Sequence, residues 1–249
     1  MFPSHDQGGQ ANTNSTLGSS NFDGTIQSTV KTSTTAGFSI VTYTGTSAST
    51  ATIGHGLGVT PKVIIVRERD ATSQWAYFQT ELGFGNKLQL DSTSQSGSSA
   101  LMNSTAPTST VFTVKNTSSG DVLNNGGLFI AYVFSEVSSY SKFGSYTGNG
   151  SSDGTFVYTG FRPAWILIKR TDSASEWSLF DTARKTFNVG DLRLEANSAS
   201  AEDSNSVNYH DILSNGFKMR NSDAARNGNG ATYIYLAFAE SPLKYARAR

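Results

Sequence analysis

Apolar and polar residues alternate in short runs along most of the chain, which is the pattern of β-strands with one buried face. The segment 37–45 shows this alternation. Val41 and Tyr43 share one face of an extended backbone there, and the opposite face carries Phe38, Ile40 and Thr42. Gly45 closes the segment. The pattern predicts a strand that ends in a glycine turn.

One run departs from alternation and is apolar throughout. Val63–Val66 consists of four consecutive β-branched residues. Such a run predicts a strand that is covered on both faces. The cover is either a second layer together with a repeat partner, or another subunit.

The chain contains an internal repeat. Residues 61–78 and 163–180 align without gaps, and both copies read as an apolar run, a polar turn and a second strand that begins with Trp. Each copy therefore predicts a β-hairpin. The final apolar segments, 128–136 and 232–240, also match. Two tandem copies of one small β unit are the simplest interpretation.

Composition supports an all-β fold. Gly, Ser, Thr and Asn are abundant, whereas the strong helix formers Leu, Lys and Glu are scarce. We expect two tandem, homologous antiparallel β-sandwich units that are jelly-roll-like. The predicted boundaries are a polar N-terminal arm at 1–36, repeat 1 at 37–139, and repeat 2 with a basic C-terminal tail at 140–249.

The N-terminal arm has two parts. Residues 1–24 are almost wholly polar, so we expect them to be flexible when alone. Residues 25–32 are richer in β-favouring side chains and read as an edge strand, as an arm laid on a neighbouring chain, or as a plain linker. The arm is a candidate attachment or oligomerisation segment.

Charge and cysteine content exclude several classes of function. Nineteen basic residues balance nineteen acidic ones, which disfavours nonspecific nucleic-acid binding. The absence of cysteine removes disulfides, thiolate catalysis and sulfur-ligated zinc. Neither a secretory signal nor an apolar run of transmembrane length is present, so we expect no membrane insertion.

Catalytic chemistry has weak support. His5, His55 and His210 are the only histidines, and we interpret His55 as a turn residue and His210 as a surface or hydrogen-bonded residue. Adjacent residues of a strand point to opposite faces, so His210 and Asp211 do not predict an acid/base pair. Five carboxylates are glycosidase candidates, but no spacing selects two of them as a catalytic pair: Glu176, Asp181, Glu195, Glu202 and Asp203. We expect no enzyme activity and no cofactor.

Aromatic residues and polar loops are the candidates for binding. Trp75, Trp165 and Trp177 could stack on sugars, but their apolar strands favour core packing. A polar loop precedes the last strand of each repeat, and the two loops match. Turn chemistry explains them better than calcium binding does. We predict that these loops are exposed and carry the binding residues, which are Asp121, Asn124, Asn125, Asn221, Asp223, Arg226, Asn227 and Asn229.

Several long blocks resemble a known family. The blocks 37–45, 53–66, 75–78, 103–114, 142–170, 213–220 and 232–249 are similar to the repeated C-terminal module of tail fibre-like proteins of marine bacteriophages. The resemblance covers 37–249. Such modules commonly end a longer polypeptide, whereas only 36 residues precede the module here.

The resemblance implies a non-enzymatic virion structural protein, located in the phage particle as a tail fibre or surface appendage that attaches to a host-surface glycan or protein. The strands that are apolar on both faces predict a homo-oligomer, and the resemblance adds a trimer by analogy. The alternative is a structural adaptor or decoration protein that binds other virion components, through the N-terminal arm. A glycan depolymerase is the third reading.

Overall fold

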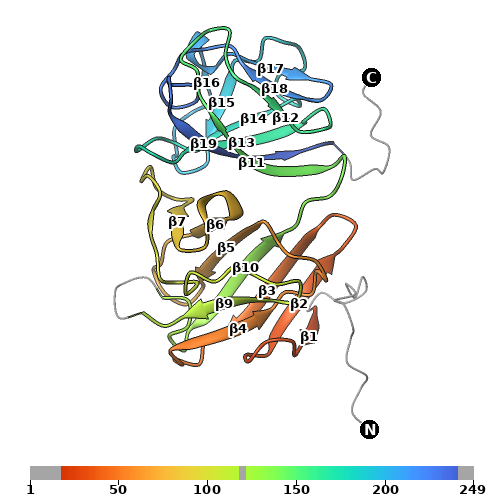
Figure 1. Ribbon diagram of the computed structural model, residues 1–249, viewed down its shortest axis with the longest axis vertical. Coiled ribbons are helices and arrows are strands. Elements are labelled where there is room, and N and C mark those ends of the chain that lie inside the picture. Colours follow the sequence, from red (N-terminus) through yellow and green to blue (C-terminus); the bar gives the residue numbers. More distant parts are fainter. Residues whose placement is uncertain (1–17, 118–121, 241–249) are drawn as a thin grey trace. The chain divides into compact units, whose positions relative to one another are not determined.

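The computed structural model describes residues 18–117 and 122–240, and antiparallel β-sheets account for nearly all of its regular structure (Figure 1). The only helices among these residues are two short 3-10 turns, η1 (Thr80–Leu82) and η2 (Ser206–Asn208). Neither is long and apolar enough to cross a membrane. The prediction of an all-β fold is confirmed.

The described residues form two compact units. The first holds residues 18–89, 97–117 and 122–135, and the second holds residues 90–96 and 136–240. The segment 90–96 therefore belongs to the second unit although it lies in the sequence of repeat 1.

The first unit has a large sheet and a small one. The large sheet has eight strands in the order β1-β2-β3-β10-β5-β6-β7-β8, and the small sheet pairs β4 with β9. The bounds are β1 (Ser19–Asn21), β2 (Ser28–Ser33), β3 (Phe38–Thr44), β4 (Thr50–Gly54), β5 (Val63–Glu68), β6 (Ala76–Gln79), β7 (Asn86–Gln89), β8 (Gly97–Ser98), β9 (Val111–Lys115) and β10 (Leu128–Phe134).

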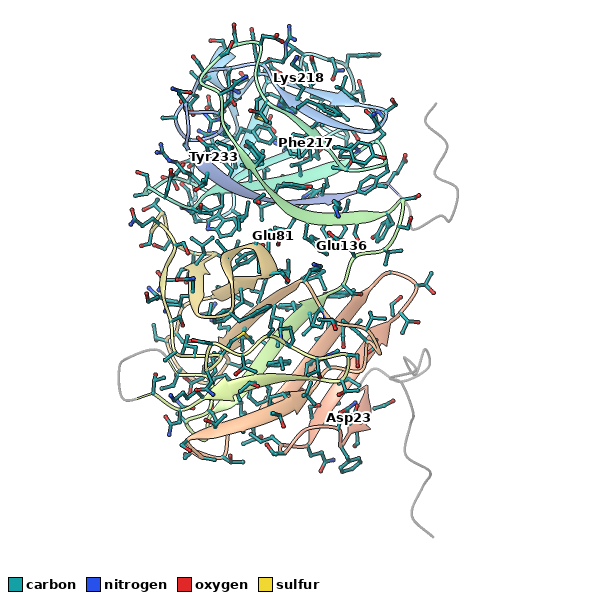
Figure 2. The ribbon with its side chains drawn as sticks, viewed as in Figure 1. Asp23, Glu81, Glu136, Phe217, Lys218 and Tyr233 are labelled. Atoms are coloured by element: carbon teal, nitrogen blue, oxygen red, sulfur yellow. The ribbon has the colours of Figure 1, made fainter. Side chains whose placement is uncertain are left out.

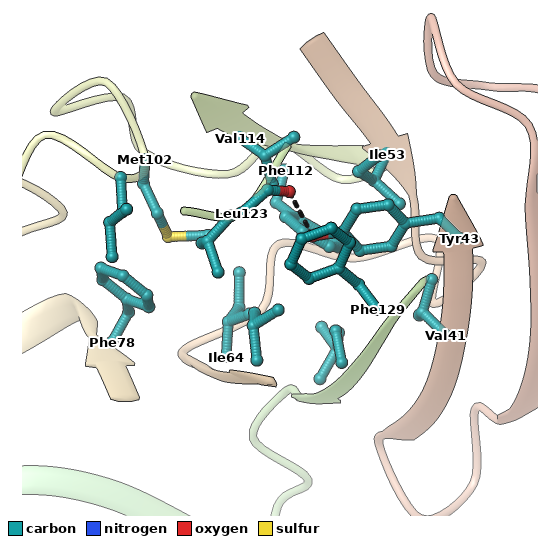
Figure 3. Packing of buried hydrophobic residues seen from close by; sticks show 14 of the residues in the cluster. Val41, Tyr43, Ile53, Ile64, Phe78, Met102, Phe112, Val114, Leu123 and Phe129 are labelled. Carbon is teal, nitrogen blue, oxygen red and sulfur yellow. Dashed lines mark hydrogen bonds between the residues drawn. The ribbon is translucent and has the colours of Figure 1, made fainter. Parts of the chain in front are cut away.

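The core of the first unit lies between these two sheets (Figure 3). Alternation puts Val41 and Tyr43 of β3 on the inner face, as the sequence predicts. Ile53 of β4 and Phe112 of β9 come from the small sheet and are fully buried in the same cluster. The hydroxyl of Tyr43 donates to the carbonyl of Leu123 at 3.0 Å.

The second unit repeats this plan. Its large sheet has the order β11-β19-β13-β14-β15-β16, and its small sheet has the order β12-β18-β17. The bounds are β11 (Ser141–Thr147), β12 (Phe156–Tyr158), β13 (Trp165–Arg170), β14 (Ser178–Asp181), β15 (Leu192–Glu195), β16 (Asp203–Ser204), β17 (His210–Leu213), β18 (Gly216–Met219) and β19 (Thr232–Phe238).

Strand order and register correspond between the units. In each large sheet the last strand in sequence, β10 or β19, lies between the first and the third strands of its repeat. Aromatic pairs occupy equivalent places in this arrangement. Tyr43 stacks on Phe129 with ring centroids 5.0 Å apart, and Tyr146 stacks on Tyr233 with centroids 4.9 Å apart. These pairs allow positions of one unit to be matched with positions of the other.

Residues 18–36 differ from the prediction of a separate arm. They contain β1 and β2, and β2 pairs with β3 along its whole length, from Ser28 to Ser33. Hydrogen bonding to an existing strand supplies the order that this polar segment lacks by itself. Residues 1–17 and the basic tail 241–249 lie outside the described residues.

The apolar run Val63–Val66 is buried at all four positions, as predicted for a strand covered on both faces. Ile64 and Val66 belong to the core cluster between the sheets, and alternation turns Val63 and Ile65 to the other face. The predicted oligomer stays a prediction.

Candidate functional site

His55 is a structural residue of the first unit. It is fully buried beside Gly56, whose φ of 70° lies in the left-handed region. The ring nitrogen Nδ1 accepts from Leu57 N at 3.2 Å, so Nε2 carries the proton and donates to Thr108 O at 3.3 Å. Burial lowers the pKa of His55 to about 4. The ring is therefore neutral near pH 7 and replaces backbone hydrogen bonds in a tight bend.

His210 is also a structural residue, and it is buried in the second unit instead of lying on the surface. Its Nδ1 donates to Asn208 O at 2.9 Å, and its ring lies 4.3 Å from the ring of Phe180. Burial lowers its pKa as well. Asp211 lies on the other face of β17, and its carboxylate is 3.6 Å from Arg220 Nε. The two neighbours do not form an acid/base pair.

The five carboxylates weighed as glycosidase candidates all have partners. Arg184 binds Asp181 and Glu202, each at 2.6 Å. Arg193 binds Glu195 at 2.8 Å and Asp203 at 3.1 Å. Glu176 accepts from the amide of Asn197. These ion pairs cross-link β14, β15 and β16 and the loops beside them, which is a structural use.

Residues 18–117 and 122–240 contain no group of three or more His, Asp or Glu side chains that could hold a metal ion. A small cavity in the first unit, lined by Glu68, Gln74 and Lys87 among others, measures about 10 Å³. That volume suits roughly one water molecule.

The tryptophans divide into one core residue and two that are half-buried. Trp177 is fully buried, as predicted. Trp75 packs on Tyr132 with centroids 5.9 Å apart, and the guanidinium of Arg67 lies 5.2 Å from its ring. Trp165 packs on Phe238 at 5.6 Å. The prediction of core packing is thus too strong for Trp75 and Trp165.

The loops predicted to be exposed binding loops are partly buried clamps, so the prediction of exposure is wrong at four positions: Asn124, Asn221, Arg226 and Asn227. Asn124 shows the reason in the first unit. Its Oδ1 accepts from Thr46 N at 2.7 Å, and its Nδ2 donates to Ala48 O at 2.8 Å. The amide fixes the loop after β3 to the loop before β10.

Asn227 has the same role in the second unit. Its Oδ1 accepts from Asn149 N at 3.1 Å, and its Nδ2 lies within hydrogen-bond distance of Asn149 Oδ1, Ser151 O and Asn221 O. Asn221 in turn donates to Tyr209 O at 2.9 Å. Because each amide satisfies buried backbone groups, these polar side chains are inside the protein.

Arg226 is the most unusual member of this set, because only 2% of it is exposed. Its guanidinium donates to Ser178 Oγ and to Val207 O, both at 3.2 Å, and lies 2.8 Å from Asp223 Oδ1. The equivalent residue of the first unit is Leu123, since each carbonyl accepts from the equivalent tyrosine. A buried polar network in one unit therefore replaces apolar packing in the other.

The other four predicted loop residues are Asp121, Asn125, Asp223 and Asn229. Asn125 and Asn229 are exposed, and the side chain of Asn125 bonds to Glu68 Oε1 at 2.8 Å. Asp121 lies outside the described residues. Asp223 is half-buried and held by Arg226.

Lys169 is a buried titratable residue that the sequence analysis did not single out. Its amine donates to Thr93 O at 3.1 Å and to Arg170 O at 2.9 Å, both within the second unit. Burial lowers its pKa to about 8. Full burial of the side chain leaves no path for a substrate, so we interpret Lys169 as a tether for segment 90–96.

The best candidate for a binding surface is the outer face of the small sheet β12-β18-β17. Alternation along β12 turns Phe156 and Tyr158 outward, where they are 43% and 64% exposed, while Val157 is buried between them. Phe156 lies opposite Lys218 in the ladder, and Tyr158 lies opposite Gly216. Large aromatic side chains usually point toward the core. Two that are exposed on the same short strand therefore need an explanation.

Charged side chains border this aromatic pair. Lys218 and the buried Phe217 are neighbours on β18 that point to opposite sides of the small sheet (Figure 2). Asp153 lies 2.6 Å from Lys218 Nζ and 3.8 Å from Arg220 Nη1. The hydrogen bond from Lys218 lowers the pKa of Asp153, so the carboxylate of Asp153 is charged at neutral pH. We call Phe156, Tyr158, Lys218, Arg220 and Asp153 the aromatic face.

The first unit has nothing comparable at the same place. Val157 pairs with Phe217 and Ile53 pairs with Phe112, so Phe156 and Tyr158 correspond to Thr52 and Gly54. There the chain itself covers the strand, because Thr25 N donates to Thr52 Oγ1 at 2.9 Å. The aromatic face is therefore specific to the second unit. The alternation Phe-Val-Tyr indicates that Phe156 and Tyr158 share one face of a strand, but it does not indicate that this face is exposed.

Comparisons with known proteins identify a family and no characterised relative. No curated protein and no solved structure matches the chain significantly. A family model described as "Domain of unknown function (DUF7483)" matches residues 11–242, which include both units. The chain therefore belongs to the DUF7483 family of domains of unknown function.

Proposed function

We propose that this protein is a non-enzymatic adhesion protein of a phage particle, a tail fibre or appendage that attaches to a glycan of the host surface through the aromatic face. The virion assignment rests on the resemblance described above for residues 37–249. The exposure of Phe156 and Tyr158 on adjacent outward positions of β12 is the observation that carries the binding surface.

The chemistry of the aromatic face suits a saccharide. An exposed aromatic ring packs against the C–H groups on one side of a pyranose, and it is rigid before binding. Carboxylate, ammonium and guanidinium groups beside the rings can hydrogen-bond the hydroxyls of the sugar. Asp153 and Arg220 are 80% and 42% exposed in their side chains, so they are accessible for this role.

The weak affinity expected of one shallow site fits an oligomeric appendage. A flat surface buries little of a sugar, and its affinity depends on repetition. Several copies held on one particle raise the effective concentration of sites, so avidity can exceed the single-site affinity by roughly 10²–10⁴.

Adsorption to host cells tests this proposal. The double variant F156S/Y158S removes both rings and keeps polar side chains at solvent positions, so the sandwich core is unchanged. We expect the purified wild-type protein, displayed on beads to restore multivalency, to adsorb to host cells, and the double variant to adsorb at least about tenfold less.

A matched variant separates adhesion from nonspecific apolar contact. F22S removes a phenylalanine that is 57% exposed in the first unit. We expect F22S to adsorb like the wild type. Equal adsorption by F156S/Y158S and wild type would contradict the aromatic face, and release of reducing ends from host polysaccharide would contradict the non-enzymatic assignment.

A further inference from the structure

The two units differ at the edge of β12, which no strand of the described residues covers. Adhesion through the aromatic face does not involve this backbone edge. In the first unit the equivalent edge, on β4, is covered by the chain itself. Ile26 forms a parallel bridge with Ile53, and Ile26 N donates to Thr52 O at 3.1 Å. Ser28 Oγ donates to Gly54 O at 2.8 Å. Segment 24–28 thus acts as an added strand.

The covering segment fits closely against β4. A Cβ atom added to Gly54 would lie only 1.6 Å from Asn21 Oδ1, so Asn21 occupies the space above this glycine. Ile26 is 6% exposed and belongs to the core cluster of the first unit. The segment therefore contributes a backbone hydrogen bond, polar side-chain contacts and one buried apolar side chain.

In the second unit, backbone groups on one edge of β12 point to the position that corresponds to the place of segment 24–28 beside β4. Thr155 O accepts from Met219 N at 3.1 Å, and Thr159 N donates to Asn215 O at 3.0 Å, so these residues face β18. Strand geometry then turns the backbone N–H and C=O of Phe156 and Tyr158 away from β18. No strand within 18–117 and 122–240 pairs with β12 on that side.

Chain connectivity explains the missing cover. The first unit is preceded by β1, β2 and the segment between them, whereas β10 ends at Phe134 and β11 begins at Ser141. The link 135–140 already contributes a bridge between Val137 and Ser141. It is too short to supply a strand for β12 as well.

We propose that β12 is a strand-addition site that binds an extended segment of another polypeptide, in the place that residues 24–28 take on β4. This inference goes beyond adhesion, because it uses the backbone edge of β12 and concerns a protein partner. Addition of an extended peptide to an unpaired sheet edge next to exposed apolar side chains is an established mode of peptide binding.

The first unit indicates the chemistry of the partner segment. It is uncharged and extended, and it places a β-branched apolar residue between residues with hydroxyl or amide side chains, as in Thr25-Ile26-Gln27. A second copy of this chain is the poorer donor. Its own residues 24–33 are already bonded to β4 and β3.

A peptide that copies the covering segment provides the probe. We would titrate an acetylated, fluorescent Gly24–Val30 peptide into the full-length protein and follow fluorescence anisotropy. Saturable binding is expected, and a peptide with Ile26→Asp should bind at least about tenfold more weakly because it lacks the apolar residue.

Two variants at one position identify the backbone as the binding element. Tyr158→Ala and Tyr158→Pro both remove the ring, but only Tyr158→Pro removes the N–H that faces the free edge. We expect Tyr158→Pro to bind the peptide about tenfold more weakly than Tyr158→Ala. Phe156→Pro against Phe156→Ala is the second pair if Tyr158→Pro fails to fold by circular dichroism.

Three results would overturn the proposal. They are the absence of saturable binding, equal binding by the proline and alanine variants, and self-association that the proline variants abolish, since that result makes a second copy the occupant. Retained peptide binding by F156S/Y158S would support this site, whether or not the same variant loses host-cell adsorption.

Discussion

The hydroxyl of Tyr146 donates to the backbone carbonyl of Arg226 at 2.6 Å, across the interior of the second unit. Tyr43 makes the same bond to Leu123 at 3.0 Å in the first unit. Each bond joins the first strand of its repeat, β3 or β11, to the loop that precedes the last strand of that repeat, β10 or β19. The pair of bonds fixes the two polar loops whose exposure the sequence had suggested.

Removal of either hydroxyl should destabilise its own unit. Tyr146→Phe leaves Arg226 O buried without this donor, so we expect a loss of about 1–3 kcal/mol in the free energy of unfolding, and the same for Tyr43→Phe. Urea unfolding measures both. Tyr158→Phe, which changes an exposed ring, should alter stability by less than about 0.5 kcal/mol. Equal effects at all three positions would contradict the role of these bonds.

Asn227 and Asn229 lie in the same loop, but their replacement by Ala should change the stability of the protein by very different amounts. Asn227 is fully buried with partners on both ends of its amide, whereas Asn229 is exposed. We expect Asn227→Ala to cost about 3 kcal/mol or more, since several buried groups lose partners, and Asn229→Ala to cost less than about 0.5 kcal/mol. Thermal unfolding of both variants gives the comparison. Similar midpoints would show that Asn227 is not a clamp.

The buried guanidinium of Arg226 predicts coupling with Ser178. Arg226→Leu introduces the residue that the first unit has at this place, but it leaves Ser178 Oγ and Val207 O without this donor. We expect a loss of about 3 kcal/mol. Ala76 is the equivalent of Ser178, so R226L/S178A should recover part of the loss. A double-mutant cycle measures the coupling, and strict additivity would contradict the contact.

Stability should decrease in acid because of His55. Its pKa is lowered from 6.5 to about 4 in the folded state, so the unfolded chain binds the proton more tightly. The stabilisation is complete above pH 6.5 and is lost as the pH falls through this range, by about 3 kcal/mol at pH 4.

His55→Thr is the matched variant for this pH effect. Thr159 occupies the equivalent bend of the second unit, where its hydroxyl bonds to Phe161 O at 2.6 Å. Denaturant unfolding at several pH values should give a shallower decline for the variant. His210 titrates in both proteins, so the difference between the curves reports His55. Parallel curves would show that His55 does not titrate in this way.

Most strands were readable from the sequence, because burial of one face imposes alternation. Val41 and Tyr43 in β3 are examples. β4 was missed because Thr50–Gly54 contains a single large apolar residue, Ile53, and is recognised by its pairing with β9. Local pattern cannot supply a long-range partner.

The candidate site was less predictable. Asn124 and Asn227 were placed on the surface because amide side chains are usually exposed. Their burial depends on backbone groups that only the folded loops bring near. One signal was available, since Tyr43 with Asn124 and Tyr146 with Asn227 have the same spacing in the sequence. The exposure of Phe156 and Tyr158 could not be foreseen, because it depends on the absence of a covering segment.

The position of β10 and β19 has a consequence for synthesis. Each is the last strand of its unit to be translated, yet each is inserted between two strands made much earlier. A nascent chain therefore cannot complete the first sheet before the ribosome has passed Phe134, and until then the edges of β3 and β5 that pair with β10 have no partner strand. Such non-local pairing slows folding and lengthens the period in which the emerging chain needs protection from aggregation.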